Sequence, residues 1–91
     1  MAICLKFELV EVVDTTARYR FGGCNEVLDG VFEIDITKLV RGDIDGDTPI
    51  SQVVRLMNDK QSQSMANRVF GEIYRHYLKD SKYPEEGGYY A

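Results

Sequence analysis

The chain has 91 residues, a net charge of −4, one His, two Cys and no Trp. Its 15 acidic residues against 11 basic ones argue against nucleic acid and anionic membranes as partners, since both attract basic surfaces. No apolar run approaches the roughly 20 residues of a transmembrane helix, and the start of the chain lacks the pattern of a signal peptide. We therefore expect a single cytoplasmic domain over residues 1–91, with Cys4 and Cys24 as free thiols.

The first part of the chain predicts an antiparallel hairpin. Apolar and polar residues alternate with period two from Ile3 to Val13, and again from Ala17 to Phe21, with the turn candidate Asp14–Thr16 between them. The alternation fades near Val13, where a bulge or a covered second face would explain the change. Gly22-Gly23 then ends or bends the second strand.

The middle of the chain predicts one more strand and an ambiguous segment. Residues Val31–Leu39 alternate as a third strand, and residues 41–47 form an acidic loop. Residues 48–57 fit a helix with a Thr48 cap or a short strand, and we favour a fourth strand because two helices would leave almost no connection. Asn58 or Asp59 would then cap the next helix.

An apolar stripe at helical spacing predicts a helix over Gln61–Lys79, with Gly71 on its far side. The expected fold class is α+β: a small antiparallel sheet of three or four strands packed against one long C-terminal amphipathic helix. The expected core residues are Leu5, Phe7, Leu9, Tyr19, Phe21, Phe32, Ile34, Ile36, Val69, Phe70 and Ile73.

Two candidate chemical sites are weak. Asp43, Asp45 and Asp47 begin like a calcium loop, but the Gly and the bidentate Glu of an EF-hand are missing at their positions, so we interpret them as a solvated turn. His76 lies one helical turn from Glu72, and a lone His at the margin of a helix is usually a surface residue. We expect no catalytic, cofactor-binding or metal-binding residues.

Two features point to binding of a macromolecule. Arg18 and Arg20 share the solvent face of the predicted hairpin with Lys6, where Glu8 and Glu11 can neutralise them. Residues 83–91 form an aromatic C-terminal tail, and three tyrosines there predict docking on the domain itself or on a partner. The candidate interface residues are Arg18, Arg20, Tyr83, Tyr89 and Tyr90.

These features favour a small, soluble, non-enzymatic binding protein of the inhibitor, immunity or accessory type. In size and composition alone the chain is similar to small acidic accessory proteins of bacteria and phages. We expect a protein partner of basic character, no nucleic acid, no membrane and no cofactor, and a homodimer stays open. The alternative is a small-ligand-binding protein or small enzyme, with a pocket between sheet and helix or at a dimer interface.

Overall fold

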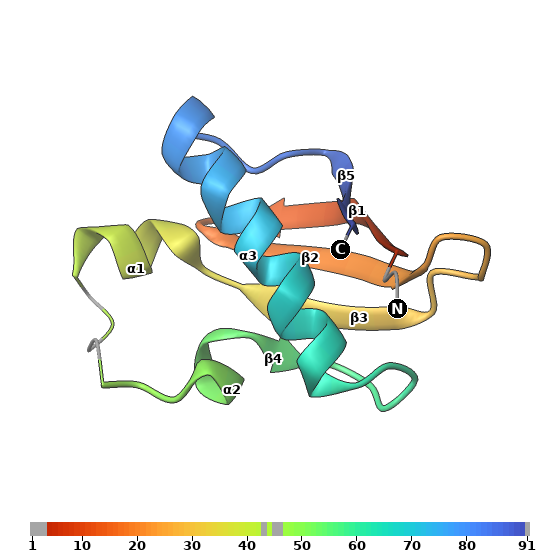
Figure 1. The fold of residues 1–91 in the computed structure, drawn as a ribbon. Helices are drawn as coiled ribbons and strands as arrows, with labels where there is room; N and C mark the ends of the chain where they lie inside the picture. The colour runs from red at the N-terminus through yellow and green to blue at the C-terminus, as the bar shows by residue number, and fades with distance from the viewer. Residues whose placement is uncertain (1–3, 43, 45–46, 91) are drawn as a thin grey trace.

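The computed structural model describes residues 4–42, 44 and 47–90. Five strands form one antiparallel sheet in the order β4-β3-β2-β1-β5, and helix α3 crosses one face of this sheet (Figure 1). The elements in chain order are β1 (Cys4–Val13), β2 (Thr16–Gly23), β3 (Gly30–Ile34), α1 (Ile36–Arg41), α2 (Ile50–Val53), β4 (Arg55–Leu56), α3 (Gln63–Asp80) and β5 (Glu86–Tyr90). The fold class is α+β, as the sequence predicted, but the sheet has five strands rather than three or four.

Strands β1 and β2 form the predicted hairpin. Val13 pairs with Thr16 across the turn, where Asp14 has a positive φ of 56°. The register shifts between Leu9 and Glu11, so a bulge changes which residues of β1 point to each face. Strand β2 ends at Gly23, as predicted, and Gly22 and Gly23 still pair with Lys6 and Leu5 of β1.

The fifth strand comes from the segment predicted as a tail. Residues 86–90 pair antiparallel with β1, from Glu8↔Glu86 to Cys4↔Tyr90. Gly87 makes this close approach possible, since a Cβ there would lie 2.6 Å from the ring of Phe7. Helix α3 is therefore followed by a strand of the sheet and is not the last element of the fold.

The strand predicted over Val31–Leu39 is wrong beyond Ile34. Asp35 caps α1 by accepting a hydrogen bond from the backbone N–H of Lys38 at 2.9 Å, and its other carboxylate oxygen accepts one from the Thr15 hydroxyl at 2.6 Å. Ile36 is still fully buried. The alternating pattern therefore identified Ile36 correctly as a core residue, but Ile36 belongs to helix α1 and not to a strand.

The ambiguous segment 48–57 contains both elements. The short helix α2 ends at Val53, and β4 then pairs Leu56 with Phe32 and Arg55 with Glu33. The cap predicted at residue 58 or 59 is also wrong, because the helix starts later. Ser62 caps α3, accepting from the N–H of Met65 at 3.1 Å.

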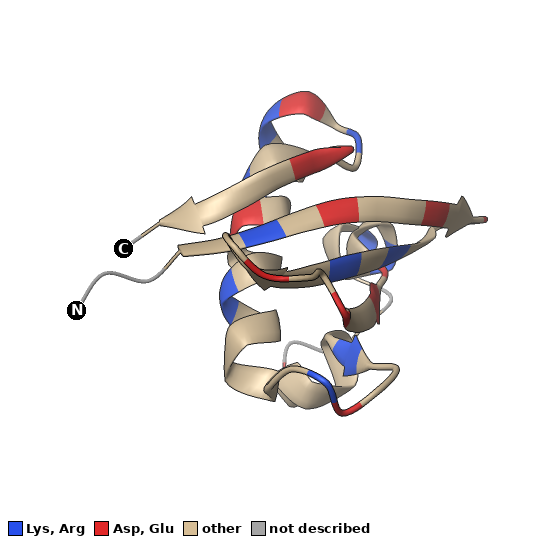
Figure 2. Cartoon of the chain, turned by 90° about the vertical axis from the view of Figure 1, so that its right-hand side faces the viewer, with Lys and Arg blue, Asp and Glu red and all other residues tan. Residues whose placement is uncertain are grey.

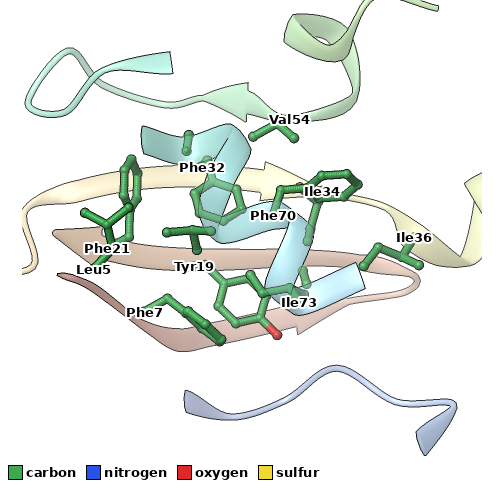
Figure 3. Close-up of a cluster of buried hydrophobic side chains, with 13 residues drawn as sticks. Leu5, Phe7, Tyr19, Phe21, Phe32, Ile34, Ile36, Val54, Phe70 and Ile73 are labelled. Atoms are coloured by element: carbon green, nitrogen blue, oxygen red, sulfur yellow. The ribbon is translucent and has the colours of Figure 1, made fainter. Parts of the chain in front are cut away.

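The core lies between α3 and the sheet, where Figure 3 shows Phe7, Tyr19, Phe21 and Phe32 on the strands facing the helix. Tyr19 is central: its ring lies 5.7 Å from that of Phe7 and 5.8 Å from that of Phe32. Every predicted core residue is buried except Leu9, which is partly buried, and Ala17, Val54 and Ala66 join them.

Candidate interaction surface

The sheet face opposite α3 carries a ladder of ion pairs. We call this the outer face; its charged residues are Lys6, Glu8, Glu11, Arg18, Arg20, Glu33, Arg55 and Glu86. Arg18 contacts Glu11 at 3.0 Å and Glu33 at 3.5 Å, and Arg55 contacts the same Glu33 at 3.9 Å. Arg20 pairs with Glu8, its cross-strand neighbour. Register alone brings these pairs together, because opposite residues of antiparallel strands lie close on one face.

The outer face is open to solvent. In Figure 2 the strands lie in front of α3, with blue and red bands along them. The side chains of Arg18 and Arg20 are 41% and 51% exposed, and those of Glu8 and Glu11 are 41% and 47% exposed. Exposed ion pairs each contribute little to stability, commonly below about 1 kcal/mol. This surface can therefore exchange its internal pairs for charges on a partner at small cost.

The candidate interface residue Tyr83 is engaged inside the domain. Its hydroxyl donates to the carbonyl of Thr15 at 2.7 Å and accepts from the N–H of Ile36 at 2.8 Å. Its ring lies 5.1 Å from that of Tyr77. Next to it, the Tyr19 hydroxyl donates to the carbonyl of Pro84 at 2.6 Å. Tyr83 therefore joins the hairpin turn, the start of α1 and the end of α3.

Burial raises the pKa of both of these phenols. For Tyr19 the loss of hydration is the larger cause and the neighbouring Tyr83 adds to it, so the pKa lies far above the ordinary value of 10.0. For Tyr83 burial also outweighs the hydrogen bonds that favour the ionised form, and its pKa is raised too. Both groups stay neutral through the physiological range.

The other two tail tyrosines differ in exposure. Tyr89 is half-buried against the core, whereas Tyr90 is 68% exposed. Tyr90 lies beside Gly88, where a Cβ would come 2.6 Å from the Tyr90 hydroxyl oxygen. Of the three tail tyrosines, only Tyr90 leaves most of its ring open to a second molecule.

The expectation of free thiols is wrong, because Cys4 and Cys24 form a disulfide with a Cα–Cα distance of 5.5 Å. The hairpin register places them at matching positions, and the N–H of Cys24 donates to the carbonyl of Cys4 at 3.2 Å. The bulge between Leu9 and Glu11 shifts the register by one residue, and this shift brings Cys4 opposite Cys24. Disulfides persist mainly in oxidising compartments, and the cytoplasmic location stays a prediction.

The weak chemical candidates stay apart from this surface. His76 is exposed on α3, whereas Glu72 is partly buried and pairs with Arg75. Among the acidic loop residues, Asp43 and Asp45 lie outside the described residues, so the solvated turn stays a prediction. In residues 4–42, 44 and 47–90 no three His, Cys, Asp or Glu side chains are grouped to hold a metal ion.

Comparison of the chain with protein-family models, with characterised proteins and with solved structures gave no match in any of the three. Within the part of the chain that the structure describes, no helix is both long and apolar enough to span a membrane.

Proposed function

We propose that the protein is a small non-enzymatic binding protein that recognises another protein through the outer face of its sheet. The observation that supports this most is the ion-pair ladder, in which Arg18 and Arg20 stand exposed at positions fixed by strand pairing. A rigid pattern of alternating charge favours one partner over others by complementarity and steers association. An inhibitor, immunity or accessory role fits this mode of action.

The chemistry of the partner follows from the same charges. The outer face presents both signs, so a partner must present both in a matching order. The net charge of −4 favours a partner of overall basic character, because long-range attraction raises the rate of encounter.

The alternative is a small-ligand-binding protein or small enzyme. One observation favours it: a polar hollow of about 330 Å³, lined by Thr16, Asp35, Lys38, Gln52 and Arg55 among others, lies at one end of the sheet. A ligand pocket between the sheet and α3, the other place where we expected one, is less favourable because aromatic side chains fill that space. Asp35 is already engaged as a helix cap, which makes it a poor general base in this hollow.

The test is affinity capture from an extract of the source cell with the tagged chain. We expect a stoichiometric protein partner, and we expect Arg18→Glu with Arg20→Glu to abolish its capture. The matched control is Arg68→Glu with Lys79→Glu, which makes the same charge change on exposed positions of α3. Equal loss with both double variants would point to net charge rather than the outer face. A co-purifying small molecule without a protein partner would instead favour the alternative.

A further inference from the structure

The two edges of the sheet differ in their protection. Strand β4 has only two residues, one of them the charged Arg55. Strand β5 has five residues with Glu86 as its one charged side chain, and its pairing with β1 contains no bulge. Short strands, charges and bulges are the usual means of blocking an edge. Strand β5, at the end of the sheet beside β1 in Figure 1, is therefore the edge that can accept another strand.

The backbone groups that β5 leaves open follow from its register. The N–H of Leu9 donates to the carbonyl of Glu85 at 2.7 Å, which marks this level as a hydrogen-bonded pair of the β1–β5 ladder. Hydrogen-bonded pairs alternate along an antiparallel ladder. Gly87 and Tyr89 therefore bond to β1, whereas Glu86, Gly88 and Tyr90 direct their N–H and C=O groups away from it.

We propose that this edge pairs with the β5 strand of a second copy of the chain, antiparallel and about a two-fold axis at Gly88. The open groups are symmetric about that residue, so Gly88 meets Gly88 and Glu86 meets Tyr90 of the other copy. This register forms about six backbone hydrogen bonds. This edge adjoins the outer face, where Glu86 stands opposite Glu8, but the proposed pairing uses the backbone of β5 and not the Arg18 and Arg20 side chains of the proposed function.

The side chains favour a second copy as the occupant. In this register Tyr89 lies opposite Gly87 of the other copy, so a large side chain always faces a small one. Glu86 lies opposite Tyr90, whose phenol can donate to its carboxylate, and no like charges stand opposite each other. Within one copy Glu86 instead stands opposite Glu8. Pairing also covers Tyr90, the open tyrosine.

The first test is amide hydrogen exchange of the full chain, measured by NMR over a concentration series into the millimolar range. Exchange at Gly88 should slow as concentration rises, because its N–H gains a partner only in the dimer. Gly87 is the internal control, since its N–H bonds to β1 in both states and should not respond. Exchange at Gly88 that is independent of concentration, with a monomer throughout in sedimentation, overturns the proposal.

The second test uses charge in place of backbone. Tyr90→Glu puts two like-charge pairs in the dimer and should weaken self-association by about tenfold. Adding Glu86→Lys to this variant should restore association, because residues 86 and 90 meet only between copies; within one strand they are about 13 Å apart. Arg18→Glu with Arg20→Glu should leave the dimer intact. If Glu86→Lys fails to restore association, the proposed register is wrong. If the chain is a monomer and a different protein pairs with β5, the proposal that a second copy pairs there is wrong.

Discussion

The disulfide gives the sharpest test of the hairpin register. Cys4 and Cys24 are separated by 20 residues along the chain. Closing a loop of this length in the unfolded chain removes entropy equivalent to about 3 kcal/mol at 25 °C. A domain of this size has a free energy of unfolding of roughly 5–14 kcal/mol, so the bond contributes a large part of it. The double variant Cys4→Ser with Cys24→Ser should therefore unfold at a urea concentration about 1–3 M lower.

The assay is urea unfolding of the native chain and of the double variant, each with and without reductant. Reductant should lower the midpoint of the native chain to that of the variant and leave the variant unchanged. Since Cys4 is exposed and Cys24 half-buried, the serines themselves should cost little. Equal midpoints for the oxidised chain and the variant would refute the entropic reasoning. An intact mass that shows two free thiols would refute the pairing itself.

Three changes of side chain and one of pH follow from the same packing. Gly71→Ala should raise the free energy of unfolding by about 1 kcal/mol, because a Cβ there meets nothing within 4 Å; a lower urea midpoint would contradict this. Phe70→Ala should cost about 3–5 kcal/mol, since the ring is only 8% exposed, and an unchanged midpoint would argue against the core. Tyr83→Phe should cost about 2 kcal/mol through two lost backbone hydrogen bonds, measured in the same way. The raised pKa values of Tyr19 and Tyr83 stabilise the fold fully at pH values below about 10, the pKa of the unfolded phenol. Above pH ~10 the free energy of unfolding should fall by up to about 1.4 kcal/mol per pH unit for each group. Urea midpoints that stay flat above pH ~10 would contradict the burial of these phenols.

Local patterns predicted the hairpin, the outer-face charges and most of the core, because each depends on periodicity within one segment. The outer-face pairing of Arg20 with Glu8 needed only the strand period and an antiparallel partner. The errors came from contacts between distant segments. Asp35 ends β3 by capping α1, and its second oxygen is held by Thr15, 20 residues away. Strand β5 forms because β1 has a free edge, a property that the sequence of residues 86–90 does not contain.

The neighbours of β1 set a requirement on how the sheet is completed. Its one side pairs with the next strand along the chain, but its other side pairs with residues about 80 positions later. During synthesis on a ribosome, β1 would therefore emerge long before β5. Until β5 is made, the edge of β1 that pairs with it has no hydrogen-bonding partner from that strand. Contacts of such long sequence separation slow folding. We expect the first hairpin to need shielding during synthesis, and the last strand to close the domain only when the whole of this region has left the exit tunnel.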